Sequence, residues 1–255
     1  MRELALLAKE LEEHLRLKTR IIGYKKIEGA EELEKMEGVT RIDHLFTFCQ
    51  IPFMARVSGL TVGITKNDKM LGRCMRISGL KAATEKSMVT EAEDLSTTWF
   101  GSTEDGLCQQ KDYPRIPPGG AIVVGPLADE KFNPDVILIY GNTAQTMMLM
   151  CGLQKEKYER FEFSFIGEGA CADSLARCYV SRKPAVAIPC YGERIFGQVA
   201  DDEIVIALPA TYMERAISGL KKLASIGLKY PIRFIGGEAD ITPVLMELYP
   251  KAFKR

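Results

Sequence analysis

One pattern occurs twice in the chain, in segments more than a hundred residues apart. Residues 46–64 read FTFCQIPFMARVSGLTVGI, and residues 169–188 read GACADSLARCYVSRKPAVAI. In each segment a cysteine, Cys49 or Cys171, is followed by Ala-Arg, by Val-Ser and by an apolar stretch that alternates as a β-strand does. The second copy has one residue fewer between the cysteine and the arginine. The pattern therefore predicts a helix that leads into a strand, formed twice.

A further cysteine follows each predicted strand, Cys74 in the first copy and Cys190 in the second. We predict from this an internal duplication with halves 1–110 and 111–255, related by a pseudo-twofold axis and folded as two domains or fused into one. The alternative is chance recurrence, because cysteine, alanine and β-branched residues are common in such elements.

Apolar runs elsewhere in the chain predict strands that alternate with helices. Residues 121–127 and 135–142 are continuous apolar runs, which are typical of strands covered on both faces. Residues 161–167 alternate as a strand does, and residues 210–227 have helical periodicity. This mixture predicts an α/β or α+β fold in which helices pack on a mixed sheet.

The composition describes an ordinary globular protein without a strongly charged surface. The 255 residues are 46% hydrophobic and carry 34 basic and 34 acidic side chains. A net charge of zero argues against nucleic acid as a partner, because phosphate binding requires a concentrated basic surface. The first eighteen residues have the pattern of an amphipathic helix, and no apolar run reaches the length of a membrane span. We therefore expect a cytoplasmic protein with no membrane partner.

Seven cysteines in such a compartment are expected to remain reduced. An odd number of scattered cysteines does not resemble a disulfide framework. If the halves pack about a common axis, Cys49, Cys74, Cys171 and Cys190 converge, and four thiolates suit an iron–sulfur cluster or zinc. The chain has no CxxC spacing, so simple packing of small apolar side chains is the alternative.

Polar residues at the ends of two predicted strands are candidates for ligand binding. Gly192, Glu193 and Arg194 follow the strand that ends near Cys190, and arginine binds carboxylate or phosphate in bidentate fashion. Pairing of Arg194 with the acidic residues 201–203 is the alternative. Asn142 and Gln145 open a helix after another strand, where free N–H groups favour polar ligands, although a simple helix cap explains them equally well.

Signatures of common enzyme classes are absent from the sequence. It contains no dinucleotide-binding glycine motif, P-loop, GxSxG or HExxH. A nucleophilic Cys49 or Cys190 would lack a convincing base, because His44 is poorly spaced from Cys49 and His14 lies in a surface-type helix. Whether the protein is an enzyme is left open.

Several motifs together resemble the archaeal and bacterial family called domain of unknown function 169. They are FCQIPFMARVSGLTVGITKND, FNPDVILIYGNTAQ, GACADSLARCYVSRKPAVAIPCYGERIFG and GLKYPI, and they span nearly the whole chain. The resemblance adds Gln50 to the candidate residues and places family cysteines at the four positions of the repeat. Thr143 stands where the family often has proline, and Met75 stands where it has proline after cysteine. A link of the family to anaerobic organisms would suit oxygen-sensitive chemistry.

Two functions follow from these observations. The first is a redox-linked protein whose four cysteines bind an iron–sulfur cluster or another metal, with zinc as the alternative. In it Gln50, Arg56, Asn142, Gln145, Gly192, Glu193 and Arg194 shape an adjacent site for a small molecule or cofactor. The second is a non-catalytic carrier or sensor in which the cysteines are structural. Neither function specifies a substrate, and neither decides whether the protein forms a homo-oligomer.

Overall fold

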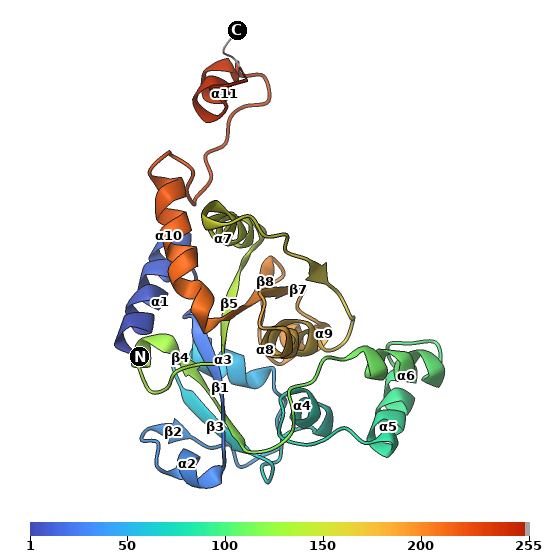
Figure 1. Cartoon of the computed structure of the whole chain (residues 1–255). Helices are drawn as coiled ribbons and strands as arrows, with labels where there is room; N and C mark the ends of the chain where they lie inside the picture. The colour runs from blue at the N-terminus through green and yellow to red at the C-terminus, as the bar shows by residue number, and fades with distance from the viewer. Residues whose placement is uncertain (253–255) are drawn as a thin grey trace.

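The computed structural model describes residues 1–252 as one eight-stranded sheet with helices on both faces (Figure 1). The strands lie in the order β2-β3-β4-β1-β5-β8-β7-β6. Their bounds are β1 Ile22–Ile27, β2 Val39–Thr40, β3 Thr61–Thr65, β4 Ala121–Pro126, β5 Val136–Asn142, β6 Phe163–Ser164, β7 Ala185–Ala187 and β8 Glu203–Pro209.

The helices include three short non-α segments. The α-helices are α1 Arg2–Leu15, α2 Ala30–Glu34, α3 Gln50–Arg56, α4 Gly72–Ile77, α5 Glu85–Ser96, α6 Thr103–Asp112, α7 Thr143–Glu156, α8 Arg177–Ser181, α9 Tyr191–Ile195, α10 Met213–Ala224 and α11 Thr242–Leu248. Segments η1 Leu127–Asp129 and η3 Ala210–Tyr212 are 3₁₀ turns, and η2 Ala172–Ala176 is a π-helix.

The strand order is the same on the two sides of the sheet. From the central pair β1 and β5 outwards, each side contains the first, fourth, third and second strand of its set. The strand senses agree too, because β2–β3 and β6–β7 are parallel and all other pairs are antiparallel. Duplication of one four-stranded unit would produce this order. Since β4 lies beyond residue 110 yet pairs with β1 and β3, the predicted halves share one continuous sheet; their pseudo-twofold relation stays a prediction.

Side chains of the central strands alternate between two cores. In β5, Leu138 and Tyr140 belong to the core beneath α3, α4 and α8, whereas Ile137 and Ile139 belong to the core beneath α1, α7 and α10. This double coverage explains why the sequence of β5 is apolar throughout. The strand expected at residues 161–167 is shorter, because only Phe163–Ser164 pair with β7 at the edge of the sheet.

Two parts of the molecule extend from this body. Helices α5 and α6 pack on each other beside α4, and the chain after α10 leads away from the sheet to α11 (Figure 1). None of the helices in residues 1–252 is both long and apolar enough to cross a membrane.

Candidate four-cysteine centre

Four cysteines lie on the sheet face that α3, α4 and α8 cover. Cys49 directly precedes α3, Cys74 lies within α4, Cys171 directly precedes the π-helix η2, and Cys190 directly precedes α9. Cys49 is half-buried, and the other three are buried. A thiol at the beginning of a helix is exposed to free N–H groups, which favour the thiolate.

The four thiols are close enough to influence one another. Burial raises the pKa of Cys171, and Cys74 and Cys190 raise it further. Cys49 hydrogen-bonds to Cys190, and a Cβ atom placed on Gly192 would lie 3.7 Å from each of their two sulfur atoms. Gly192 thus leaves space beside this pair. The structure brings the cysteines of the two sequence repeats into one cluster, which we call the four-cysteine centre.

Cys190 is the most acidic of the four thiols. Its pKa is lowered to about 5, first by the hydrogen bond from the Cys49 thiol and then, against the effect of burial, by the backbone N–H groups of Ala170, Gly169 and Glu193. The same hydrogen bond raises the pKa of Cys49, because the Cys49 thiol donates it and must keep its proton to do so. At neutral pH the pair therefore consists of one thiolate and one thiol.

Two carboxyl groups complete the surroundings of this thiolate. Glu193 is 3% exposed, and burial together with the Cys190 charge raises its pKa to about 8. Burial and Cys190 also raise the pKa of Glu168, whose Oε1 lies 3.2 Å from Nη2 of Arg73. One Glu193 oxygen has no hydrogen-bond partner within residues 1–252. Glu193 is thus a group of the centre that changes protonation near neutral pH.

These side chains are not arranged around a single ion. Within residues 1–252, no group of three or more His, Cys, Asp or Glu side chains has the arrangement that holds a metal ion. A tetrahedral zinc site would require the sulfur atoms to approach to about 3.8 Å from one another, given Zn–S bonds of about 2.3 Å.

The family model DUF169, described as "Uncharacterised ArCR", matches residues 10–219. The chain belongs to the DUF169 family. A relative, "Uncharacterized protein MJ0308" of Methanocaldococcus jannaschii, is 23% identical over 224 residues, which cover 86% of this chain and 94% of the relative. No solved structure matches. The DUF169 match contains all four cysteines of the centre and ends within α10, so α11 lies outside it.

Arg56 of this DUF169 protein lies near the centre and uses both of its Nη atoms in contacts within the fold. It is 3% exposed, lies 3.3 Å from Oε1 of Glu203 and donates to the carbonyl of Gln198 at 3.0 Å. Its guanidinium group lies 4.5 Å from the centroid of the Tyr140 ring. Arg56 lowers the pKa of Glu193, so it acts on the centre through charge.

Other predicted site residues form hydrogen bonds within the fold. Asn142 and Gln145 form a capping box at the beginning of α7, and Gln145 also donates to the carbonyl of Leu15 at 2.8 Å. Gln50 accepts a hydrogen bond from the N–H of Thr47 before α3.

Arg194, the candidate arginine near Cys190, contacts residues a few positions further along the chain. Arg194 donates to the carbonyl of Ala200 at 2.8 Å and lies 3.7 Å from Asp201, the alternative that the sequence left open. Arg177, the arginine of the second sequence repeat, begins α8 and pairs with Asp173 of the preceding π-helix η2. Of the polar candidates, Gly192 and Glu193 contact the thiols, and Arg56 lies near Glu193.

Three residues at the centre were not predicted from the sequence. Arg73 and Glu168 lie 95 positions apart and pair beside the thiols, although each is within three residues of a candidate cysteine. Tyr113, which directly follows α6, hydrogen-bonds through its hydroxyl to the carbonyl of Glu168. In the sequence, proximity to a cysteine could have pointed to Arg73 and Glu168, whereas no sequence feature pointed to Tyr113.

His44 occupies a different environment from the one a catalytic base for Cys49 would need. Its side chain is 70% exposed and its ring lies 3.3 Å from Asp43. The described residues include no hydrogen bond between His44 and a cysteine. The structure therefore offers Glu193, rather than a histidine, as the titratable neighbour of the thiols.

Proposed function

We propose that this protein binds an iron–sulfur cluster at Cys49, Cys74, Cys171 and Cys190 and acts in redox-linked metabolism in the cytoplasm. The observation that carries the proposal is the convergence of four unpaired thiols from four separate elements on one face of the sheet. Cysteine thiolates are the usual ligands of such clusters. A small molecule is the partner that we expect next to the cluster.

The electrostatics of the four-cysteine centre support this proposal. Burial raises the pKa of Cys74 and Cys171, which therefore stay protonated, while Cys190 is already a thiolate. Metal cations stabilise thiolates directly and would displace the remaining protons. Arg73 and Arg56, which lie near Glu168 and Glu193 respectively, would offset part of the negative charge that four thiolates bring.

An iron–sulfur cluster requires a less compact set of ligands than a single zinc ion does. A cluster spreads its four thiolates over several iron atoms, so its cysteines stand farther apart than around one tetrahedral ion. The described side chains do not close around a single ion. Zinc is the alternative only if the sulfur atoms move together on binding.

Anaerobic reconstitution with iron and sulfide tests the proposal. We expect a broad absorbance near about 400 nm and stoichiometric iron and sulfide. Cys49→Ser, Cys74→Ser, Cys171→Ser and Cys190→Ser should each lower iron content and absorbance severalfold. The matched control is Cys108→Ser, which replaces an exposed cysteine outside the centre and should leave both unchanged.

A protein that stays colourless after reconstitution, or that loses as much iron in Cys108→Ser as in Cys190→Ser, would refute the proposal. Stoichiometric zinc without sulfide would instead assign the four thiols to a single-ion site.

The second candidate is a carrier or sensor in which the cysteines are structural. The hydrogen bond between Cys49 and Cys190 favours it, because this thiol–thiolate pair is satisfied without a metal. In this case the four serine variants would bind no less iron than wild type, and each would lower the free energy of unfolding of the metal-free protein.

A further inference from the structure

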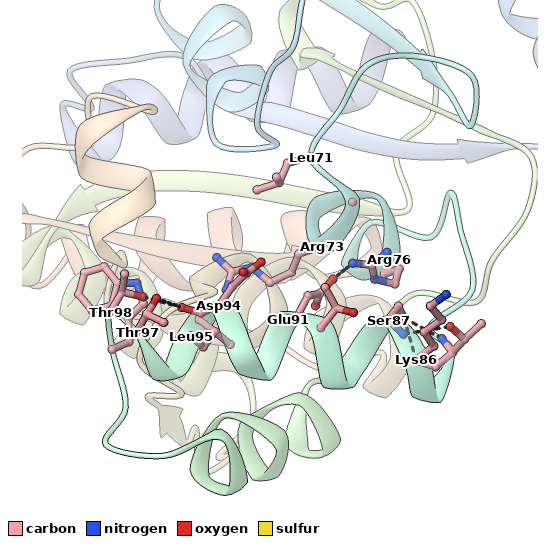
Figure 2. Close-up of a pocket in the computed structure, with 14 residues that line it drawn as sticks. Leu71, Arg73, Arg76, Lys86, Ser87, Glu91, Asp94, Leu95, Thr97 and Thr98 are labelled. Atoms are coloured by element: carbon pink, nitrogen blue, oxygen red, sulfur yellow. Dashed lines mark hydrogen bonds and ion pairs between the residues drawn. The ribbon is translucent and has the colours of Figure 1, made fainter.

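A groove whose lining residues are mostly polar or charged lies between α4 and α5, next to the four-cysteine centre. Its volume is about 700 Å³, within the range of small-molecule sites. Figure 2 shows α5 running along the groove with Arg73 and Arg76 extending towards it from α4. Neither the cluster proposal nor the family match assigns a role to this groove.

Basic side chains concentrate at the α4 side. Arg76 pairs with Glu91 of α5, and Arg73 pairs with Glu168 at the cysteine centre. A third cation, Lys86 of α5, also lines the groove. The groove wall thus carries three cations and two carboxylates, those of Glu91 and Asp94. A bound anion would balance the excess positive charge.

Gly72 makes room for this arrangement. A Cβ atom at Gly72 would lie 3.2 Å from both Nη atoms of Arg76, tighter than most real contacts. The guanidinium group can therefore lie over the beginning of α4, where it lines the groove. The Nε atom of Arg76 has no hydrogen-bond partner within residues 1–252, so this side chain is incompletely satisfied by the fold.

An aromatic surface closes the other end. Trp99 is 47% exposed and its ring centroid lies 5.4 Å from that of Tyr191, the residue after Cys190. The two rings connect the groove to α9, which Cys190 directly precedes. Asp94, also on the groove wall, could accept a hydrogen bond from a hydroxyl or amino group of a ligand (Figure 2).

We propose that this groove binds a small organic anion, with its carboxylate or phosphate oxygens on Arg73 and Arg76 and its carbon skeleton against Trp99. Arg73 contributes to both places, because it lines the groove and pairs with Glu168 beside the thiols. The ligand would therefore lie next to the cysteine centre without contacting a metal ligand.

Trp99 is the single tryptophan of the chain, so its fluorescence reports on the groove directly. We propose titrating the purified protein with citrate and, separately, with inorganic pyrophosphate at constant ionic strength. A saturable change with citrate assigns a carboxylate ligand, and one with pyrophosphate assigns a phosphate ligand. Either result supports the proposal.

Arg76→Gln should weaken the apparent affinity by at least about tenfold, the usual effect of losing a charged hydrogen-bonding partner. Lys86→Ala, which removes an exposed cation from the groove wall without disturbing a buried pair, should weaken it severalfold. The matched control is Arg41→Gln, because Arg41 also pairs with an acidic residue, Asp68, but lies outside the groove. It should bind as wild type does.

Absence of a saturable change with both anions would overturn the proposal, as would equal affinities in wild type, Arg76→Gln and Lys86→Ala. The same titration on Cys190→Ala separates this site from the cluster. We expect that variant to keep wild-type affinity within about twofold, whether or not the four thiols bind iron.

Discussion

Cys190 and Glu193 form the most strongly perturbed pair of side chains in the centre. The thiol pKa is lowered to about 5 by Cys49 and backbone N–H groups, and the carboxyl pKa is raised to about 8 by burial and the thiolate. A protonated, neutral Glu193 therefore lowers the electrostatic cost of the buried Cys190 thiolate. Perturbed groups of this kind concentrate at functional sites.

Glu193→Gln tests this pairing through the pH dependence of stability. A pKa raised in the folded state contributes stability that is complete below the unfolded value of 4.5 and is lost as pH rises through about 8. Cys190 acts in the opposite sense, because its lowered pKa adds stability as pH rises above about 5. The variant removes only the contribution of Glu193. The difference in free energy of unfolding, variant minus wild type, should therefore become more positive by roughly 2–4 kcal/mol as the pH rises from 4.5 to about 8.

Urea unfolding of the metal-free protein at several pH values measures this difference. The control is Glu247→Gln on α11, an exposed position where the same chemical change should leave the pH dependence as in wild type. A constant difference between Glu193→Gln and wild type at all pH values would show that Glu193 stays ionised in the fold.

At the residue scale the sequence located the thiols but not their surroundings. The repeat spacing predicted which four of seven cysteines to group, and those four lie together. Asn142 and Gln145 were ambiguous, because the residues that bind polar ligands at a helix start are also the residues of a capping box. Arg73, Glu168 and Tyr113 come together only through long-range folding, which local spacing does not encode.

Among the elements, α7 and α10 pack most closely. A Cβ atom on Gly219 of α10 would lie 1.8 Å from the carbonyl oxygen of Gly152 on α7. The two helices touch backbone to backbone at these glycines, and they cover the sheet face opposite the cysteines. Their contact holds α7, which follows central strand β5, in place.

Gly219→Ala should therefore destabilise the protein by roughly 2–4 kcal/mol, as overpacking of a tight contact does. In an open helix the same change would stabilise by up to about 1 kcal/mol, so the sign itself is informative. Thermal or urea unfolding measures the effect. Gly101→Ala serves as the control, because nothing lies within 4 Å of a Cβ atom there; equal stabilities of the two variants would contradict the described packing.

Strands were predictable where both faces are covered. The apolar runs of β4 and β5 follow from burial on both sides of the sheet. Residues 161–167 alternate in sequence, yet Phe163 and Phe165 are 61% and 69% exposed at the edge of the sheet, so alternation there does not reflect a buried face. Edge pairing depends on neighbouring strands and not on the pattern of one segment.

At the scale of the whole molecule, one continuous sheet joins elements from both sequence repeats. Cys49 and Cys74 flank β3 in the chain, Cys171 and Cys190 flank β7, and these strands lie on opposite sides of the central pair β1 and β5. A buried ion pair between Arg56 of α3 and Glu203 of β8 crosses between the same two sets. The fold thus assembles the centre from both ends of the sheet, and chain spacing alone could not establish that convergence.

Iron K-edge X-ray absorption of the anaerobically reconstituted protein tests the central claim most directly. A cluster held by four cysteines predicts iron surrounded by sulfur, with iron–iron scattering that disappears in Cys171→Ser but persists in Cys108→Ser. Iron surrounded by oxygen or nitrogen, without iron–iron scattering, would contradict the assignment of the four-cysteine centre as an iron–sulfur site.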